Sequence, residues 1–441
     1  MNRIRWAFVW GFVVVVALWL AAHAEILFLR ELFQLRHQFI LLTGLLAFAA
    51  MAVGTMLSVR PASIEPPLGG LDKMYRLHKW LGLTALCAGV LHWLWIKAPK
   101  WAVDWGWIVR PPRGERPTLQ GLEAVFRQQR GLAETLGEYA FYALIILVCI
   151  ALFSRIPYRY FRLTHRLMAV VALLFCWHAL VLTEYADWRQ PVGWLTALLI
   201  AGCAVGALIG LCGQIGRRRQ VPARITALEP FRDNRVLKVV LGLQKPWPGH
   251  QAGQFAFVTF DPREGAHPFT ISSAWSGGDS MYFLIKGVGD YTSRLPELLR
   301  VGGKARVEGP YGSFQFGGPQ QRQIWIGAGI GITPFIARMQ TLAIEPDKRR
   351  IDLFYVTQLP DQVFVERLQG RARLAGVNLH IHINHRDPRL TGEVVREQLP
   401  DWQSASIWFC GPAGMGDELL ADMQKHGLDP AAFHREFFQM R

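Results

Sequence analysis

Two apolar stretches, residues 74–97 and 161–185, restrict what this chain can fold into more than any other feature. Each is long enough to cross a bilayer as a helix, which needs about 20 apolar residues. Each also carries two histidines, and ionisable residues are costly inside a membrane unless they bind something. The four are His78, His92, His165 and His178. The fold therefore has to bring these two stretches together in a membrane.

Six apolar runs in the first half of the 441-residue chain predict six membrane spans. The first run follows two arginines, as a signal peptide does, but it is longer than a signal core. We therefore interpret it as a retained helix. The predicted spans cover about residues 6–29, 36–59, 74–97, 135–153, 161–185 and 191–215, and the long loop 98–134 joins the third to the fourth.

Lysine and arginine are concentrated in the short loops on one side of the predicted bundle. The opposite short loops mix acidic and basic residues, and the basic 98–134 loop carries less weight because it is long. This asymmetry places the N-terminus and the chain after residue 216 in the cytoplasm, with the spans in the cell (inner) membrane. The basic side receives Arg3, Arg5, Arg60, Lys73, Arg76, Lys79, Arg155, Arg159, Arg162, Arg217, Arg218 and Arg219.

The net charge of +15 does not predict nucleic-acid binding. The arginines flank apolar runs and form no basic stripe with interleaved aromatics, so an anionic bilayer surface is the favoured partner. The six cysteines include no Cys-x-x-Cys pair, and five of them lie in apolar runs. Neither a disulfide framework nor a zinc or iron–sulfur site is indicated.

The histidine spacing predicts two metal-ligating pairs. His78 and His92 are 14 residues apart, and His165 and His178 are 13 apart, which separates the members of each stretch by about 20 Å along a helix. The third and fifth spans run in the same direction. His78 therefore meets His165 near one face, and His92 meets His178 near the other. Each pair can hold one haem iron between neutral imidazoles.

Helical phase supports this pairing only in part. A step of 14 residues keeps two side chains within about 40° of one face, whereas a step of 13 puts them about 140° apart. The fifth span therefore needs a local irregularity. The alternative is that such histidines are isolated polar groups bonded to neighbouring helices, which is our interpretation of His23 and His37. Two matched pairs on parallel spans argue against that alternative for the other four.

The second half of the chain reads as two further domains. Short alternating runs from 221 to 317 (ARITAL, VLKVVLGL, QFAFVTF, MYFLIKG, ARVEG) predict a small antiparallel β-barrel. From 318 to 441 the runs IWIGAG, IDLFYVT, LHIHINH and SIWFCGP alternate with helix-like segments, which is typical of a parallel α/β sheet. The first domain is then the six-span bundle, residues 1–216.

Three segments of the second half carry ligand-binding chemistry. His-Pro-Phe-Thr-Ile-Ser-Ser (267–273) ends a strand with hydroxyls and an aromatic, and 286–293 opens a helix with glycines and hydroxyls that suit a pyrophosphate. Gly-Ala-Gly-Ile-Gly-Ile-Thr-Pro (327–334) follows a strand and opens a helix, although it is not the GxGxxG fingerprint. Cys410-Gly411-Pro412 ends a later strand at the expected ligand-binding edge. Cys410 can also be only a small buried residue.

Taken in order, these motifs resemble the ferredoxin–NADP reductase superfamily. Behind six spans with paired histidines, they resemble ferric reductases and NADPH oxidases, particularly compact bacterial forms, over roughly residues 70–441. The resemblance implies FAD on the barrel, NAD(P)H on the α/β domain and two b-type haems in the membrane. The four histidines would ligate the haem irons.

The resemblance also implies roles for individual residues. His267, Pro268, Phe269, Thr270 and Ser272 would hold the flavin ring and ribityl chain, and Thr292 and Ser293 the pyrophosphate. Gly329, Gly331, Thr333 and Pro334 would face NAD(P)H, Cys410 and Gly411 the nicotinamide, and Phe438 (or Phe437) would cover the flavin.

Two positions depart from the family pattern. Gln358 stands where NADPH-using relatives commonly have an arginine for the 2′-phosphate, so both NADH and NADPH stay open. Ile96 stands where eukaryotic oxidases tend to have a histidine near the oxygen site, which leaves the acceptor open.

The leading hypothesis is a transmembrane oxidoreductase that passes electrons from cytoplasmic NAD(P)H, through FAD and two haems, to an acceptor on the far side. Oxygen, giving superoxide, is the predicted acceptor, and reduction of a ferric chelate is the alternative. A haem-binding membrane partner or sensor with a vestigial nucleotide domain, and a reductase merely anchored to the membrane, are the competing hypotheses. No obligatory protein partner is evident, and no EF-hand loop indicates calcium control.

Overall fold

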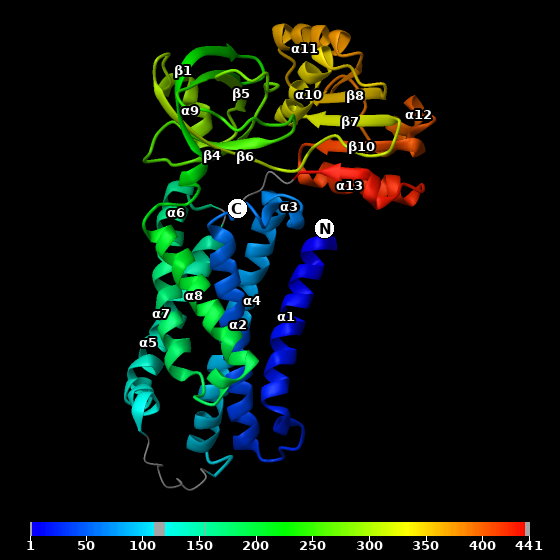
Figure 1. Ribbon diagram of the computed structural model, residues 1–441. Coiled ribbons are helices and arrows are strands. Elements are labelled where there is room, and N and C mark those ends of the chain that lie inside the picture. The colour runs from blue at the N-terminus through cyan, green and yellow to red at the C-terminus, as the bar shows by residue number, and fades with distance from the viewer. Residues whose placement is uncertain (1, 110–119, 154, 437–441) are drawn as a thin grey trace. The chain divides into compact units, whose positions relative to one another are not determined.

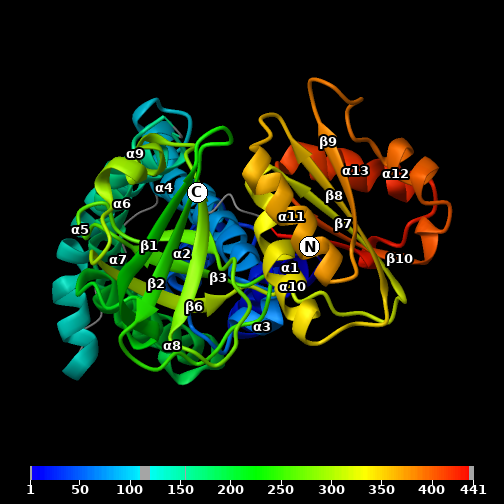
Figure 2. The same ribbon diagram turned by 90° about the horizontal axis from the view of Figure 1, so that it is seen from above.

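The computed structural model describes residues 2–109, 120–153 and 155–436 and separates into two compact units (Figure 1). One unit extends to Ile215, and the second starts at Gly216. Within the described residues, six helical spans are long and apolar enough to cross a membrane, and all lie in the first unit. The second unit contains one antiparallel and one parallel sheet (Figure 2). The fold class predicted from the sequence is confirmed.

The membrane unit is an up-and-down helical bundle. Its helices are α1 (Asn2–Ala22), α2 (Leu32–Ser58), α3 (Glu65–Leu68), α4 (Leu71–Asp104), α5 (Gly121–Leu152), α6 (Tyr158–Arg166), α7 (Met168–Leu182) and α8 (Pro191–Leu211), with the 3₁₀ turns η1 (Ala24–Leu27) and η2 (Asp187–Arg189). Small residues let the helices approach closely, as is typical of membrane bundles. For example, a Cβ atom on Gly206 of α8 would lie 3.2 Å from the backbone oxygen of Thr55 in α2.

Three span boundaries differ from the prediction. The first span ends at Ala22 and not near residue 29, because the chain turns at His23 into η1. Helices α4 and α5 extend through much of the region predicted as the loop 98–134. Hydropathy detects only the apolar part of a helix, and these extensions are amphipathic and polar.

The fifth span contains the irregularity that helical phase requires. Leu167 separates α6 from α7, and its N–H donates to the Thr164 oxygen at 3.0 Å while its oxygen accepts from Val170 N at 3.0 Å. These bonds join residues three apart, as in a 3₁₀ turn, which advances about 20° more per residue than an α-helix. The Leu167 oxygen also accepts from Val171 N at 3.2 Å, so the overwound turn is short. It rotates His178 only part of the way toward the face of His165.

The barrel of the second unit is a six-stranded antiparallel sheet in the order β4-β3-β6-β1-β2-β5. A bridge between Ile271 and Phe283 joins the two ends of this order. Its elements are β1 (Gln220–Phe231), β2 (Val236–Leu243), β3 (Phe255–Thr259), β4 (His267–Thr270), β5 (Ser280–Lys286) and β6 (Lys304–Tyr311), with helix α9 (Asp290–Leu298) and the 3₁₀ turn η3 (Arg217–Arg219) before β1.

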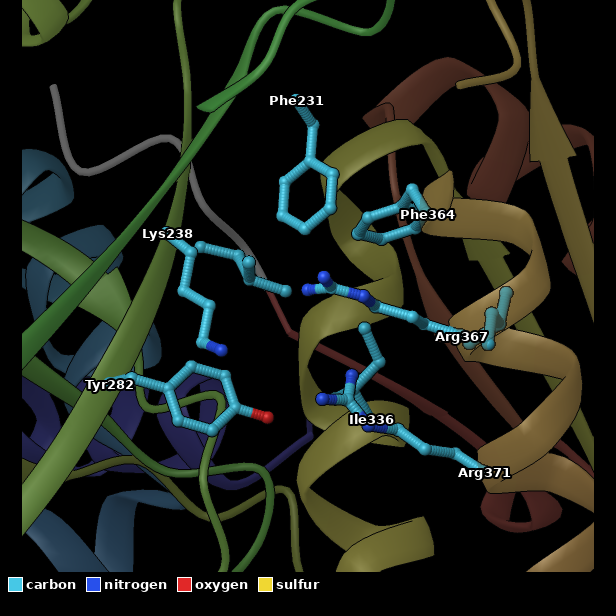
Figure 3. Close-up of a pocket in the computed structure, with 9 residues that line it drawn as sticks. Phe231, Lys238, Tyr282, Ile336, Phe364, Arg367 and Arg371 are labelled. Atoms are coloured by element: carbon cyan, nitrogen blue, oxygen red, sulfur yellow. The ribbon is translucent and has the colours of Figure 1, made fainter. Parts of the chain in front are cut away.

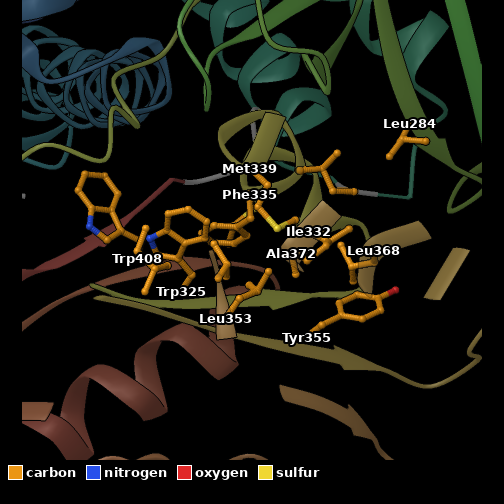
Figure 4. Packing of buried hydrophobic residues seen from close by; sticks show 14 of the residues in the cluster. Leu284, Trp325, Ile332, Phe335, Met339, Leu353, Tyr355, Leu368, Ala372 and Trp408 are labelled. Atoms are coloured by element: carbon orange, nitrogen blue, oxygen red, sulfur yellow. The ribbon is translucent and has the colours of Figure 1, made fainter. Parts of the chain in front are cut away.

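The α/β part has a five-stranded parallel sheet in the order β11-β10-β7-β8-β9. Its core stacks the rings of Trp325 and Phe335 at 5.4 Å beside Trp408 and Tyr355 (Figure 4). The elements are β7 (Arg322–Ala328), η4 (Gly329–Ile332), α10 (Thr333–Ile344), β8 (Arg350–Thr357), α11 (Gln362–Leu374), β9 (Asn378–Ile383), α12 (Gly392–Gln398), η5 (Trp402–Ser404), β10 (Ala405–Cys410), α13 (Ala413–Lys425), η6 (Pro430–Ala432) and β11 (Phe433–Arg435).

Candidate cofactor sites

The structure brings His92 of α4 and His178 of α7 together. We call them the outer pair, because they lie toward the end of the bundle opposite the end of α8, after which the second unit begins. Their ring centroids are 6.3 Å apart, and the ring planes cross at 83°. His92 Nδ1 lies 2.9 Å from the Ile40 oxygen, and His178 Nδ1 lies 2.8 Å from the Ala133 oxygen. A carbonyl can only accept a hydrogen bond, so each Nδ1 carries the proton. Each Nε2 therefore keeps its lone pair for a ligand.

His78 of α4 and His165 of α6 form the inner pair. Their ring centroids are 5.9 Å apart, with the planes at 73°. His78 Nδ1 lies 2.9 Å from the Gly54 oxygen, which fixes the same tautomer as in the outer pair. His165 Nδ1 is buried and makes no hydrogen bond with any described residue, and the ring stacks on Phe161 at 5.1 Å. One ligand of the inner pair is thus anchored by backbone and the other by ring packing.

Both pairs have the dimensions of bis-histidine haem sites. Bonds of about 2.0 Å between a metal ion and a histidine nitrogen, the value for zinc, would place the centroids of two rings that share one ion about 6.4 Å apart. The observed separations are 5.9 and 6.3 Å. Glycine also leaves room for the ligands, because a Cβ atom on Gly137 would lie 2.0 Å from His178 Nδ1. The residues therefore fit the group that the sequence predicts.

The residues predicted to hold the flavin lie on β4 and just after it. His267, Pro268 and Phe269 are half-buried, and the His267 ring stacks on Tyr291 at 4.8 Å. Thr270 is buried, and Ser272 is fully buried. The Ser272 hydroxyl is occupied within the barrel, where it donates to the Thr270 oxygen at 3.2 Å and accepts from Leu284 N at 3.1 Å. The Ser272 hydroxyl therefore fixes the end of β4. The half-buried side chains of His267, Pro268 and Phe269 offer a surface on which a flavin ring could lie.

The predicted pyrophosphate loop is shaped by the first turn of α9. Thr292 Oγ1 accepts from Gly289 N at 3.1 Å and from Val288 N at 3.2 Å, so this hydroxyl caps its own helix. Ser293 is exposed in the next position. A Cβ atom on Gly287 would lie 3.1 Å from Ser293 Cα, which explains why glycine is needed for the loop to fold back on the helix.

The two motifs of the α/β sheet meet at one edge. Strands β7 and β10 are parallel neighbours, with Gly327 paired to Cys410. A Cβ atom on Gly331 would lie 2.1 Å from the Cys410 oxygen, and one on Gly411 would lie 2.7 Å from Ala328 Cβ. Glycine at both positions therefore lets the two turns touch. This edge, at the carboxyl ends of the strands, is where open α/β sheets bind ligands.

The other predicted residues of this edge face inward. Thr333 and Pro334 are buried, and the Thr333 hydroxyl donates to the Ile330 oxygen at 3.0 Å, which secures the start of α10. Burial, with a smaller contribution from the Glu436 carboxylate, raises the pKa of the Cys410 thiol well above its usual range. A raised pKa favours the neutral thiol over the more reactive thiolate. Phe437 and Phe438 lie outside the described residues.

Sequence reasoning assigned no role to Lys286, which the structure places at the glycine turn. Lys286 ends β5, and its Nζ lies 3.6 Å from the position of a Cβ atom on Gly329. Gly329 has a φ of +57°, a left-handed conformation that glycine adopts easily. A cation therefore faces the turn that is expected to bind nucleotide. The sequence feature that could have indicated this role is the position of Lys286 directly before the glycine-containing loop 287–293.

A separate small pocket lies between the barrel and α11, where Lys238, Arg367 and Arg371 reach toward Tyr282 and Phe231 (Figure 3). None of the predicted site residues lines it. Lys238 and Arg367 both pair with the carboxylate of Glu229. Their charges are therefore partly neutralised within the protein, and the pocket has no clear anion site.

Matches to two protein families identify the chain as an oxidoreductase with membrane-spanning helices. Residues 43–176 match the family of ferric reductase-like transmembrane components, and residues 223–315 match a family of FAD-binding domains. The chain thus joins a ferric reductase-like transmembrane domain to an FAD-binding domain. The resemblance inferred from the motifs is confirmed.

Curated relatives match the reductase part. The reductase component of propane 2-monooxygenase from Rhodococcus jostii is 24% identical over 225 residues, 47% of this chain and 61% of that protein. The reductase subunit of 3-chlorobenzoate-3,4-dioxygenase from Comamonas testosteroni is 28% identical over 198 residues, 44% of this chain and 60% of that protein. The chain thus spans about 60% of the length of these two relatives.

Solved structures match the same part of the chain. Phthalate dioxygenase reductase is 21% identical, with a TM-score of 0.43, and the match covers 50% of this chain and 68% of that one. An Amycolatopsis cytochrome P450 reductase is 19% identical, with a TM-score of 0.44 and coverage of 50% and 70%.

Proposed function

We propose that this protein carries electrons from cytoplasmic NAD(P)H across the cell membrane to an acceptor at the far face. The domain 1–216 would hold two b-type haems, 221–317 the FAD and 318–441 the NAD(P)H. The observation that carries the proposal is the geometry of the two histidine pairs, with centroids 5.9 and 6.3 Å apart and three of four imidazoles oriented by backbone carbonyls. A reductase merely anchored to the membrane has no need of such pairs.

When bound, the flavin and haems supply the redox chemistry, which divides a two-electron donor into single electrons. The chain supplies position. His78 with His165, and His92 with His178, would hold the two irons at different depths of the bundle. Backbone donors at the start of α9 would bind the FAD pyrophosphate.

On the nucleotide side, Lys286 and the Gly329 turn would bind the diphosphate of NAD(P)H. Gln358 follows β8 at the position that commonly carries an arginine, and it contributes no positive charge for a 2′-phosphate. We expect NADH to be used at least as well as NADPH. The neutral Cys410 would lie against the nicotinamide without reacting with it.

The basic loops support a cytoplasmic N-terminus and reductase unit. With the cytoplasm negative, outward movement of an electron is favourable by about 2.3 kcal/mol per 100 mV. Two acceptors are compatible with this direction: oxygen, giving superoxide, and ferric iron. The match of residues 43–176 to ferric reductase-like components favours ferric iron.

The test is turnover by the purified full-length protein. NADH and NADPH are each offered with oxygen and with a ferric chelate, superoxide dismutase serves as a control, and haem and FAD are measured per chain. We expect two haems, one FAD and NADH-driven reduction of at least one acceptor. Lys286→Ala should raise the KM for NADH about tenfold with a smaller change in kcat, since a charged hydrogen bond contributes about 1.5 kcal/mol. A protein that binds haem but neither FAD nor NADH would instead be a sensor or partner.

A further inference from the structure

A cluster of histidine and carboxylate side chains lies at the end of the bundle that carries the outer pair. His23 follows α1, whereas Glu184 and Asp187 belong to the connection between α7 and α8. One ligand atom from each of the three residues lies within 4.8 Å of the others. Residues more than 160 positions apart in the sequence thus converge on one point.

His23 is buried and directed into this cluster. Its side chain is 5% exposed, and its Nε2 lies 3.3 Å from Asp187 Oδ1 yet makes no hydrogen bond with any described residue. Trp19 stacks on the imidazole at 5.1 Å and fixes its plane. The Asp187 backbone is also held, because its oxygen accepts from Gln190 N at 2.8 Å. The donor atoms are therefore fixed in place and incompletely satisfied.

The cluster is rich in negative charge. Glu184 Oε1 lies 2.6 Å from His37 Nε2, and Glu25 Oε1 lies 3.5 Å from His23 Nδ1. Among the described residues, only histidines form ion pairs with Glu184 and Asp187; no lysine or arginine does. Carboxylates that are partly withdrawn from water need a compensating cation.

The donor set selects a class of cation. One imidazole nitrogen and two carboxylate oxygens are ligands for first-row transition metals such as iron, and they leave further positions open for water or a chelator. A Mg²⁺ or Ca²⁺ site would use oxygen ligands alone. The buried imidazole of His23 therefore favours a transition metal.

The cluster is close along the helices to the outer pair. His37, at its edge, precedes Ile40 by three residues, about 4.5 Å of helix rise, and the Ile40 oxygen binds His92 Nδ1. Glu184 follows His178 by six residues. An ion bound here is thus near the last pair of the proposed electron path.

We propose that His23, Glu184 and Asp187 form a transition-metal site that holds ferric iron as the electron acceptor. This inference rests on the proposed function for its electron supply. NADH and two Fe³⁺ give NAD⁺, H⁺ and two Fe²⁺: each iron gains one electron, and the hydride supplies both electrons and the proton. Reduced iron, with its lower charge, is held less tightly by two carboxylates and leaves.

Metal binding is tested on the full-length, oxidised protein without NADH. Mn²⁺, followed by electron paramagnetic resonance, and Zn²⁺, followed by calorimetry, report the site independently of turnover. We expect one ion per chain, with affinity at least tenfold weaker in Asp187→Asn and in Glu184→Gln. The matched control is Glu31→Gln, which removes an exposed carboxylate from a loop at the same end. Equal affinity in all four proteins, or no binding by the unaltered chain, would overturn the site.

Turnover then tests its role with ferric nitrilotriacetate. We expect Asp187→Asn to raise the KM for the chelate at least tenfold at unchanged haem content, and Zn²⁺ to inhibit the unaltered protein competitively. An unchanged KM in both cluster variants would refute the acceptor role. Failure of the proposed function gives a different result: the unaltered chain would bind Mn²⁺ but reduce neither ferric iron nor oxygen. Glu184→Gln, at a half-exposed position, serves if Asp187→Asn does not fold.

Discussion

The outer and inner histidine pairs have similar ring-centroid separations, but different contacts orient their rings. Both outer imidazoles bind backbone carbonyls, those of Ile40 and Ala133. In the inner pair only His78 does so, and His165 relies on packing against Phe161. A helix backbone is more rigid than a ring contact, so the outer ligands are better preorganised.

The glycines that lie next to the rings also differ between the outer and the inner pair. A Cβ atom on Gly137 or Gly44 would lie 2.0 or 3.0 Å from the rings of His178 and His92, respectively, whereas one on Gly54 would lie 3.7 Å from His78. The outer rings are thus pressed against helix backbone. The inner ring of His78 has ordinary contact distance. Substitutions at these glycines can therefore show whether close backbone contact is needed to position the histidine rings.

Removing a ligand should have the largest effect. His92→Ala or His178→Ala should reduce haem from two per chain to one and lower NADH-driven reduction of an external acceptor at least 100-fold, because the outward path is interrupted. His78→Ala should do the same from the inner side. Haem is measured as the pyridine complex, and His426→Ala, at an exposed histidine of the second unit, is the control. Full haem content in His92→Ala would contradict the pairing.

The glycine comparison should give the next largest effect. Gly137→Ala should displace His178 and lower outer-haem occupancy several-fold, because the added carbon overlaps the ring. Gly54→Ala has room and should retain both haems, with about 1 kcal/mol of added helix stability. Haem content and thermal unfolding of the two variants decide this. Equal behaviour would mean that the close contact at Gly137 relaxes without cost.

The pairs themselves were predictable from sequence, whereas their anchors were not. On an ideal helix, residues 13 positions apart point to different faces, so an irregularity between His165 and His178 could be expected. The carbonyls of Ile40 and Ala133 carry no side-chain pattern. The cluster at His23 was also hidden, because Asp187 lies in a distant loop and a histidine in an apolar context has a simple structural explanation.

In the second unit, too, some features could be predicted from the sequence and others could not. Long alternating runs gave β1, β2 and the central parallel strands, but β4 and β11 are only four and three residues long and lack a repeat that can be detected. The contact between the Gly331 turn and Cys410 follows from the parallel sheet. Lys286 reaches the Gly329 turn from another sheet, and no local pattern encodes that approach.

Two aromatic residues offer a smaller test of the comparison. Phe161 stacks on His165 at 5.1 Å, and Phe175 meets His178 edge-on at 6.2 Å. Phe161→Leu should lower inner-haem occupancy about threefold, since ring packing is the main restraint on His165 and an aromatic contact contributes about 0.5–1.5 kcal/mol. Phe175→Leu should change occupancy less than twofold, because the Ala133 carbonyl still orients His178. A larger effect from Phe175→Leu would reverse the proposed distinction.

The smallest expected difference is in redox potential. A hydrogen bond from Nδ1 to a carbonyl makes Nε2 a stronger donor, which stabilises the ferric state and lowers the potential of the iron it binds. The outer pair has two such bonds and the inner pair one, so this effect should place the outer haem lower by tens of millivolts. Spectroelectrochemical titration measures both, and His78→Ala and His92→Ala assign them. Electron transfer from the inner to the outer haem would then be slightly unfavourable by itself, and the membrane potential, at about 2.3 kcal/mol per 100 mV, would offset it. An outer potential above the inner one would show that solvent exposure, and not ligand anchoring, sets the order.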